Sequence, residues 1–399
     1  MTNKRAPEVR FEEFIGDWEQ RNLESIYGKI RNAFVGTATP YYVEDGHFYL
    51  ESNNVKDGQI NRNTEVFIND EFYQKQKDNW LHTGDLVMVQ SGHVGHTAVI
   101  PEELDNTAAH ALIMFSNYRE KADPYFLNYQ FQTHKSKKKL GSITTGNTIK
   151  HILASEMKKF LVDIPRYEEQ QTIGNFFKLI DDTIALHQQE LTTLKQTKQG
   201  FLQKMFPKEG ESVPEIRFPG FTGDWEQRKF SNIVYRVSKQ SNDANLPKVE
   251  YEDIISGEGR LNKDISRKFD NRKGIVFEPH YILFGKLRPY LKNWLYPDFK
   301  GIALGDFWVF KPNNTSSIFD YYLIQTDKYQ TVANLSSGTK MPRSDWKTVS
   351  ETEFRIPTIE EQNKIGNFFK KLDDTIALHQ RELDALKETK KAFLQKMFV

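Results

Sequence analysis

Residues 164–207 read IPRYEEQQTIGNFFKLIDDTIALHQQELTTLKQTKQGFLQKMFP, and residues 356–399 read IPTIEEQNKIGNFFKKLDDTIALHQRELDALKETKKAFLQKMFV. The two stretches lie 192 positions apart (356 − 164 = 192) and are identical at 31 of 44 positions. Chance does not produce such a match, so the chain contains an internal repeat. This repeat decides the architecture, because any fold must place the same long element twice.

A second, shorter repeat precedes each variable stretch: PEVRFEEFIGDWEQR at 7–21 returns as PEIRFPGFTGDWEQR at 214–228. The stretches between the repeats have little mutual resemblance. A duplicated frame with two diverged inserts holds two different modules in one fixed geometry. We therefore expect a repeat segment at 1–23, a first domain at 24–163, a first long helix at 164–206, a linker with the second repeat segment at 207–230, a second domain at 231–355 and a second long helix at 356–399.

The long repeats predict two helices that pack against each other. Their apolar residues recur at alternating steps of four and three, which is the heptad pattern of a coiled coil. An Ile-Pro pair opens each copy, and proline suits the first turn of a helix. Some 40 residues at about 1.5 Å each give a rod of roughly 60 Å. The expected seam is Ile173, Phe177, Ile180, Ile184, Leu191, Leu194, Phe201 and Met205 in the first copy, and Ile365, Phe369, Leu372, Ile376, Leu383, Leu386, Phe393 and Met397 in the second.

Polar residues interrupt this seam at His187 and Lys198, and at His379 and Lys390 in the second copy. A pH switch or a metal-binding pair is one interpretation of the histidines. We favour a polar layer that fixes the register of the helices, as a buried asparagine does in other coiled coils.

The duplication also makes predictions about partners and chain ends. A repeated frame presents nearly the same surface twice, which suits the binding of two copies of one partner protein. Because the second short repeat follows the first long helix, the first short repeat should lie beside the end of the second long helix. We expect Met1 and Val399 to lie near each other and circular permutation to be tolerated.

Composition narrows the class of protein. The chain of 399 residues has 55 Lys and Arg against 54 Asp and Glu, a net charge of +1, which excludes a uniformly basic nucleic-acid coat but not local basic patches. No window reaches the roughly 18 apolar residues of a membrane span, and the first residues are too polar for a secretory signal. With no cysteine, disulfides, thiolate zinc sites and cysteine nucleophiles are excluded. We expect a soluble, cytoplasmic, mixed α+β protein.

Motifs of catalysis are incomplete. Asp123-Pro124-Tyr125-Phe126 lacks the second proline of an amino-methyltransferase motif, and no phosphate-binding G-x-x-x-x-G-K-[ST] loop occurs. The triplet Asp345-Trp346-Lys347 has no clear second carboxylate for a nuclease site. His93 and His96 would need two further ligands to hold zinc. We therefore predict that the chain is not an enzyme and binds no metal.

The repeated Gly-Asp-Trp-Glu-Gln segments, the Ile-Pro-x-x-Glu-Glu-Gln-x-x-Ile-Gly helix starts and Leu-x-Gln-Lys-Met-Phe resemble type I restriction–modification specificity subunits. GDLVMVQSGHVGHTAVIP (84–101) and ILFGKLRPYL (282–291) are also similar to that family's target recognition domains. The resemblance covers essentially the whole chain. It implies two recognition domains, each reading half of an interrupted DNA site, held apart by two antiparallel helices. It also implies assembly with two modification subunits and with restriction subunits, so that S-adenosylmethionine, ATP and Mg belong to those partners and none is bound by this chain.

Candidate DNA contacts in the first domain fall in two places. The loop after the apolar run Leu86–Val89 offers groups of groove-reading size, and a run without acidic residues offers phosphate neutralisation, although such a run is also typical of a solvated loop. The loop has a competing interpretation as a tight structural turn. The candidates are Gln90, Ser91, His93 and His96 in the loop, and Lys135, Lys137, Lys138 and Lys139 in the run.

In the second domain the apolar run Tyr281–Phe284 leads into a basic loop. Aligning the two apolar runs places Arg288 opposite His93. An arginine fork matches a guanine edge or a phosphate, while a surface ion pair is the competing interpretation. Gly146 and Gly338 share the 192 offset, so the segments 144–150 and 336–343 should be equivalent. The candidates here are Lys286, Arg288, Tyr290, Lys292, Lys340 and Arg343.

Tethering explains why two modules would be joined. One wrong base pair costs about 1–3 kcal/mol, so a single small module discriminates poorly, and a rigid rod makes the second contact intramolecular at a fixed spacing. An alternative function is a non-enzymatic coiled-coil adaptor whose two domains bind proteins.

Overall fold

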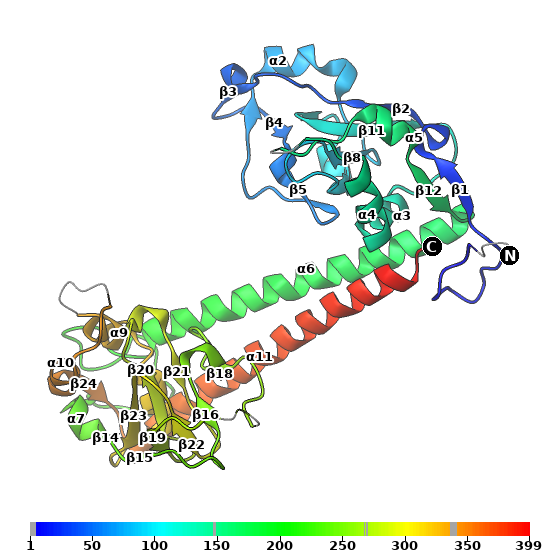
Figure 1. The fold of residues 1–399 in the computed structure, drawn as a ribbon. Coiled ribbons are helices and arrows are strands. Elements are labelled where there is room, and N and C mark those ends of the chain that lie inside the picture. Colours follow the sequence, from blue (N-terminus) through cyan, green and yellow to red (C-terminus); the bar gives the residue numbers. More distant parts are fainter. Residues whose placement is uncertain (1–4, 147–148, 267, 269, 336–340) are drawn as a thin grey trace. The chain divides into compact units, whose positions relative to one another are not determined.

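The computed structural model describes residues 5–146, 149–266, 268, 270–335 and 341–399. The chain forms two compact units: unit 1 comprises Met1–His187 and Leu383–Val399, and unit 2 comprises Gln188–Glu382. Two long helices, α6 (Tyr167–Lys204) and α11 (Ile359–Lys396), each contribute to both units. Figure 1 shows the ribbon coloured along the sequence, with α6 and α11 labelled.

Unit 1 is built on two four-stranded sheets. The first has the order β2-β11-β8-β9 with antiparallel neighbours, and the second has the order β10-β4-β7-β3 with a parallel β10–β4 pair. The pairs β1–β12 and β5–β6 form two small sheets. The strands are β1 (Glu19–Asn22), β2 (Tyr27–Asn32), β3 (Tyr42–Val43), β4 (His47–Leu50), β5 (Val55–Lys56), β6 (Gln59–Ile60), β7 (Phe67–Ile68), β8 (Leu86–Val89), β9 (Thr97–Val99), β10 (Ala108–Ala109), β11 (Leu112–Tyr118) and β12 (Leu161–Ile164).

The shorter helices of unit 1 cover the faces of these sheets. They are α1 (Leu23–Ile26), α2 (Asp70–Lys75), α3 (Pro124–Gln132), α4 (His134–Ile143) and α5 (Ala154–Lys159). The central strand β8 is buried on both faces: Leu86 and Met88 join the core that contains α3 and α6, whereas Val87 and Val89 join a separate core on the other face. This alternation follows from the two-residue period of a strand.

Unit 2 repeats the plan of unit 1. Its sheets have the orders β14-β23-β20-β21 and β15-β19-β22-β16, with a parallel β16–β22 pair, and β13–β24 and β17–β18 form two small sheets. The strands are β13 (Glu226–Lys229), β14 (Val234–Val237), β15 (Gln240–Ser241), β16 (Lys248–Val249), β17 (Ile254–Ile255), β18 (Arg260–Leu261), β19 (Gly274–Phe277), β20 (Ile282–Gly285), β21 (Trp294–Leu295), β22 (Gly301–Ala303), β23 (Phe307–Pro312) and β24 (Glu353–Ile356). The shorter helices are α7 (Phe230–Ile233), α8 (Ser317–Leu323), α9 (Asp327–Ala333) and α10 (Trp346–Glu351).

The two long helices pack against each other within each unit, as the sequence predicted. In unit 1, Phe176 of α6 meets Phe393 of α11 with ring centroids 5.2 Å apart. In unit 2, Phe201 of α6 meets Phe368 of α11 at 5.1 Å. A residue early in one helix thus pairs with a residue late in the other, so the helices run antiparallel.

The seam predicted from the heptads is buried or half-buried at every position in both helices. Two glycines add a contact that the heptads do not reveal. A Cβ on Gly174 would come within 2.4 Å of Asp123 Oδ1, and one on Gly366 within 2.4 Å of Ile318 Cγ2. The glycine in each Ile-Gly-Asn-Phe-Phe therefore lets α3 or α8 approach the long helix closely.

The repeated Glu-Glu-Gln explains how the short repeat is fixed to the helix. Arg10 makes two hydrogen bonds of 2.7 Å to the buried carboxylate of Glu169, and Arg217 makes the same contacts with Glu361 at 2.7 and 2.8 Å. The following residue, Gln170, accepts a hydrogen bond from Asp123 N at 3.0 Å. The equivalent Gln362 in unit 2 accepts from Ser316 N at 2.9 Å. In each unit, the charge-assisted pair thus holds the short repeat to the helix, and the glutamine holds the helix to the inserted domain.

The start of each long helix differs slightly from the prediction. Each helix begins two residues after its proline, Pro165 or Pro357, rather than with the proline in its first turn. The carbonyl of each proline instead accepts a hydrogen bond from the side chain of Gln170 (2.9 Å) or Gln362 (2.8 Å), which ties the chain before the helix to its first turn.

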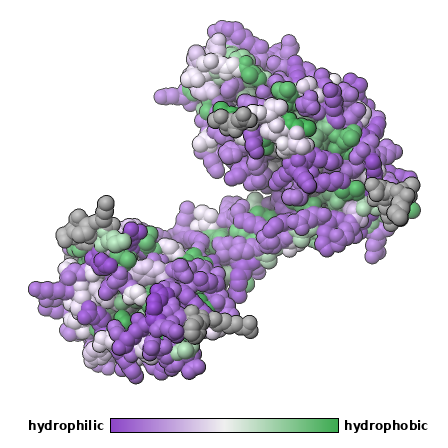
Figure 2. Space-filling model, in the orientation of Figure 1, coloured by the Kyte–Doolittle hydropathy of each residue, from purple (hydrophilic) through white to green (hydrophobic). Residues whose placement is uncertain are grey.

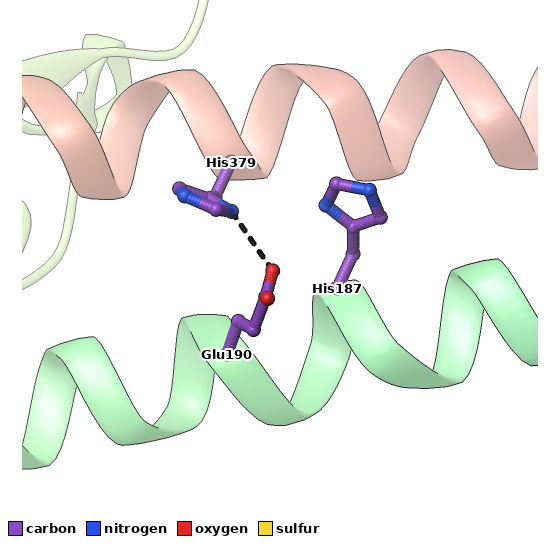
Figure 3. A group of neighbouring side chains, drawn as sticks. All are labelled: His187, Glu190 and His379. Carbon is purple, nitrogen blue, oxygen red and sulfur yellow. Dashed lines mark ion pairs between the residues drawn. The ribbon is translucent and has the colours of Figure 1, made fainter.

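Polar residues in the seam form ion pairs between the helices. In unit 2, His379 of α11 lies 3.5 Å from Glu190 of α6, as Figure 3 shows. Lys198 pairs with Asp373 at 2.7 Å in unit 2, and Lys390 pairs with Asp181 at 2.6 Å in unit 1. These pairs agree with the interpretation of a polar layer between the helices.

The first short repeat lies beside the end of α11, as the order of repeats predicted. In unit 1, Val9 N donates to Lys396 O at 2.9 Å; in unit 2, Ile216 N donates to Lys204 O at the same distance. Trp18 also packs edge-on against Phe398. Met1 lies outside the described residues, so the proximity of the two chain ends and the tolerance of circular permutation stay predictions.

The surface of each unit that Figure 2 presents is mainly hydrophilic. Within the described part of the chain, no helix combines the length and the apolar character that crossing a membrane requires.

Candidate nucleic-acid interface

The first candidate surface is the loop between β8 and β9 in unit 1. Gly92 and Gly95 adopt φ angles of 77° and 86°, which only glycine reaches without strain, and they let the loop turn back on itself. Val89 N donates to His96 O at 2.8 Å, which closes the base of the loop. His93 is exposed at the tip, whereas Ser91 and Gln90 are half-buried.

A second loop, from Thr145 to His151, is hydrogen-bonded to the first. Ser91 and His151 form an isolated bridge, Gly92 N donates to Lys150 O at 3.1 Å, and Ile152 N donates to Gln90 O at 3.0 Å. The two loops therefore form one surface, although some 50 residues separate them in sequence.

Charged groups surround His96 at the base of this surface. His96 Nδ1 accepts a hydrogen bond from Asp57 N at 3.2 Å, on the turn between β5 and β6. Burial lowers the pKa of His96, the Asp57 carboxylate opposes that shift, and the neighbouring side chains of Lys137, His93 and Lys56 lower the pKa further. Lys56 was not among the residues predicted from sequence, because only the fold brings this turn next to the loop.

The basic run 134–139 forms the first turns of helix α4 rather than a loop. Thr133 caps this helix by accepting a hydrogen bond from Ser136 N, and the helical period divides the lysines between faces. Lys137 belongs to the charges around His96, and Lys138 is exposed. Lys135 and Lys139 instead contact the frame.

Lys135 Nζ lies 3.4 Å from Asp163 Oδ2 and donates to Val399 O at 2.9 Å. Lys139 Nζ donates to Leu161 O at 3.4 Å, and burial lowers its pKa. These two lysines thus hold α4 against β12 and the end of α11, a contact that the sequence did not predict.

The corresponding surface of unit 2 is the loop between β20 and β21. Leu287 forms an isolated bridge with Arg343, and Arg288 N donates to Pro342 O at 2.8 Å. Ser344 N donates to Lys286 O at 2.9 Å. The loop after β20 is thus joined by backbone hydrogen bonds to the segment 342–344, the second loop of unit 2.

The pattern of hydrogen bonds corrects the sequence alignment of the two loops. Gly92 N donates to the carbonyl oxygen of the residue before His151, and Arg288 N donates to that of the residue before Arg343. Since His151 and Arg343 are the bridged residues of the two units, Arg288 is equivalent to Gly92 and not to His93. The offset in this loop is 196 (288 − 92 = 196), one more than the apolar runs suggested. Lys340 and Gly338, also named from sequence, lie outside the described residues.

Arg288 and Lys292 adopt left-handed backbone angles, with φ of 49° and 54°. They flank the 3₁₀ turn Pro289–Leu291. A left-handed conformation costs a non-glycine residue roughly 1–2 kcal/mol, and the equivalent of Arg288 in unit 1 is a glycine. A side chain kept at a strained position points to a function for that side chain.

The cations of these two joined loops in unit 2 fall into two groups. Lys286 and Arg343 both pair with Asp306, at 3.5 and 3.1 Å, so one carboxylate holds both loops. In the part of the chain that the structure describes, Arg288 and Lys292 form no ion pair, and Tyr290 is 55% exposed beside them. Asp306 was not predicted, because a single aspartate before β23 gives no sequence signal.

The residues weighed for catalysis have structural roles. Asp123 caps α3 by accepting from Phe126 N at 2.8 Å, and Asp345 caps α10 by accepting from Thr348 N at 2.7 Å. Among the described residues, His93 and His96 belong to no cluster of three metal-ligating side chains.

Comparisons with known proteins identify the family. The family model described as type I restriction modification DNA specificity domain matches residues 17–196 and 223–388. The type I restriction enzyme MjaVIII specificity subunit of Methanocaldococcus jannaschii is 21% identical over 405 residues, covering 95% of this chain and 91% of that one. The EcoDI specificity subunit of Escherichia coli is 22% identical, covering 57% of this chain and 58% of the relative.

Solved structures agree on the fold. The crystal structure of a type I restriction-modification S subunit from M. genitalium superposes with a TM-score of 0.66 at 14% identity, covering 99% of each chain. A chain from a study of complex assembly and conformational transition of the type I R-M system gives a TM-score of 0.52 at 14% identity, covering 94% of this chain and 96% of that one. With the family model matching both halves of the repeat, this chain belongs to the type I restriction-modification DNA specificity family: it is a DNA-binding specificity subunit, itself non-catalytic and without a cofactor of its own.

Proposed function

We propose that this specificity subunit reads an interrupted DNA site, with the paired loops of each unit contacting one half-site. The observation that carries the proposal is that both units join their two loops by the same hydrogen bonds but present different side chains. Gly92, His93 and His151 stand in unit 1 where unit 2 has Arg288, Pro289 and Arg343. One frame with two sets of side chains suits the reading of two different short sequences.

The chemistry of each set fits DNA. Arg288 and Lys292 can reach a guanine edge or a phosphate, because neither is held by a carboxylate among the described residues. In unit 1, the hydrogen-bonding groups of Ser91, His93 and His96 suit base edges, and Lys137 and Lys138 suit phosphates. Lys135 and Lys139 would reach phosphates only by leaving their contacts with the frame.

The long helices would set the distance between the half-sites. Each helix has 38 residues, and about 1.5 Å per residue gives a length of roughly 57 Å. Each wrong base pair costs about 1–3 kcal/mol in either half-site. Tethering the two readers makes their selectivities multiply when the spacing of the DNA site matches the protein.

As a member of its family, the chain works in a type I restriction-modification complex with other subunits. We infer that the duplicated frame docks two modification subunits, because it offers the same surface twice. Restriction subunits would add ATP-dependent cleavage, so that S-adenosylmethionine, ATP and Mg bind to the partners. Since the double-stranded DNA of the cell is the substrate, we place the complex in the cytoplasm.

Single-molecule methylome sequencing of cells with this gene intact and deleted tests the proposal. We expect one interrupted motif to lose its methylation on deletion. If the complex with modification subunits methylates a continuous motif, the two-half reading is wrong. If the assembled complex has no salt-sensitive affinity for DNA and no motif changes, the two domains bind proteins, and the chain is an adaptor.

A further inference from the structure

Two large apolar side chains are exposed beside the candidate DNA-reading loops. Ile149 is 56% exposed in unit 1, and Met341 is 52% exposed in unit 2. Each stands in the second loop of its pair, the one that is hydrogen-bonded to the loop after the buried strand β8 or β20. Within the described part of the chain, neither residue belongs to a hydrophobic core cluster.

The two residues occupy equivalent positions. Each lies two residues before the residue that bridges to the first loop, His151 for Ile149 and Arg343 for Met341. Their separation, 341 − 149 = 192, equals the offset of the long repeats that follow them. Inserts that otherwise differ in sequence thus share an exposed apolar side chain at one place.

The surroundings favour DNA over a core contact. Lys150 follows Ile149 in the chain, and Arg288 N donates to Pro342 O, in the residue after Met341, so each apolar side chain has a cation near it. Leaving an isoleucine or methionine exposed forgoes the stabilisation that burial of its apolar surface would give. In a DNA groove, the cation would meet phosphate oxygens while the apolar side chain meets the bases.

We propose that Ile149 and Met341 are equivalent apolar DNA contacts, one for each half-site. Each would contact the bases while the nearby cation binds the phosphate backbone. This inference rests on the proposed function, because it requires that both units bind DNA. The apolar group that they meet is either the methyl group of a thymine in the major groove or the face of a base step opened in the minor groove. Ile149 would therefore influence only the half-site read by unit 1, and Met341 only the other.

The test uses the full chain assembled with its modification subunits. Ile149→Ser and Met341→Ser are compared with Val35→Ser and Tyr235→Ser, which remove equally exposed apolar side chains (60% and 55%) outside these loops. Fluorescence anisotropy at one fixed salt concentration gives the affinity for a duplex with the methylated motif and for a duplex without it. We expect each test variant to bind the motif at least roughly fivefold more weakly, with non-specific binding unchanged and both controls like the wild type.

Two DNA probes distinguish the two sources of the apolar contact. Replacing thymine by uracil in one half-site removes the methyl group; if it weakens the wild type but not the matching serine variant, the contact is a thymine methyl. A rise in 2-aminopurine fluorescence with the wild type, absent with the variant, identifies an opened base step. Either result supports the proposal.

Two results overturn it. If both variants bind the motif as tightly as the wild type, the side chains do not contact DNA. If they fail to assemble with the modification subunits, as judged by mass photometry, while the controls assemble, this surface binds protein instead. Loss of motif-specific affinity in the wild-type complex itself would be a failure of the proposed function rather than of these two residues alone.

Discussion

Asp181 of α6 and Lys390 of α11 form a buried ion pair in unit 1, with 2.6 Å between Oδ1 and Nζ. The Tyr129 hydroxyl donates to the other carboxylate oxygen of Asp181 at 2.9 Å, and the ammonium lies 5.3 Å from the centre of the Tyr129 ring. Unit 2 repeats the arrangement with Asp373, Lys198 and Tyr322. One network therefore joins both long helices to the inserted domain, at equivalent places in the two units.

Removing one partner of this network should be costly. We expect Lys390→Met to lower the free energy of unfolding by about 3–5 kcal/mol, because it leaves the Asp181 carboxylate buried without its cation. Lys391→Met, at the exposed neighbour, should change it by less than about 0.5 kcal/mol. Urea denaturation measures both.

The double variant Asp181→Asn with Lys390→Met distinguishes an ion pair from simple packing. Because both charges are then gone, it should recover much of the stability lost in the single variant. Additive losses in the double variant would show that the pair does not act as a unit.

Asp320 in α8 predicts a pH dependence of unit 2. The side chain is fully buried, its Oδ2 accepts from Thr315 Oγ1 at 2.6 Å, and burial raises its pKa well above the ordinary value. Unfolding exposes the carboxyl, which then loses its proton above pH 4 or so. The contribution of Asp320 to stability is thus complete at low pH and is lost as the pH rises toward the raised pKa.

We expect Asp320→Asn to flatten this dependence. Between pH 5 and pH 8, the melting temperature of the wild type should fall relative to that of the variant, because asparagine has no proton to lose. Parallel pH profiles for the two proteins, measured by circular dichroism, would show that Asp320 does not have a raised pKa.

Arg288→Gly should separate folding from DNA binding. Glycine removes the cost of the left-handed backbone, so the variant should be more stable by about 1 kcal/mol. It should also bind the motif roughly 5- to 150-fold more weakly, the equivalent of about 1–3 kcal/mol for a lost base contact. Calorimetric melting and anisotropy of the assembled complex check the two parts.

Arg288→Ala is the matched control, since it removes the side chain but keeps the backbone strain. It should lose affinity without gaining stability. If Arg288→Gly binds the motif like the wild type, the strained arginine does not contact DNA.

The length of the long helices predicts the length of the unread spacer. Inserting one heptad at equivalent places in α6 and α11 keeps the seam in register but should lengthen the rod by roughly 10 Å. We expect the modified complex to methylate a motif with the same half-sites and a longer spacer. An unchanged spacer would show that the helices do not act as a ruler.

Much of the frame could be predicted from sequence because it is repeated. The 192 offset located both long helices, and the heptads identified seam residues such as Phe177 and Phe369, which are fully buried. The order of repeats also predicted that the first short repeat meets the end of α11. These features depend on local periodicity, which the residues themselves carry.

The candidate site was harder to predict because contacts between distant segments form it. Neither Lys56 beside His96 nor Asp306 between Lys286 and Arg343 has a local pattern around it. The lysine run was not recognised as part of a helix because its charge concealed an amphipathic pattern, in which Leu140 is buried. The loop alignment missed by one residue because only backbone hydrogen bonds show that Arg288 replaces Gly92.

The most direct test of two independent half-site readers is an exchange of one domain. Residues 24–163 are replaced by the corresponding domain of another specificity subunit, and the methylome of cells carrying the hybrid is sequenced. The account predicts a motif in which one half-site changes while the other half-site and the spacer stay the same. A motif in which both half-sites change, or neither does, would contradict it.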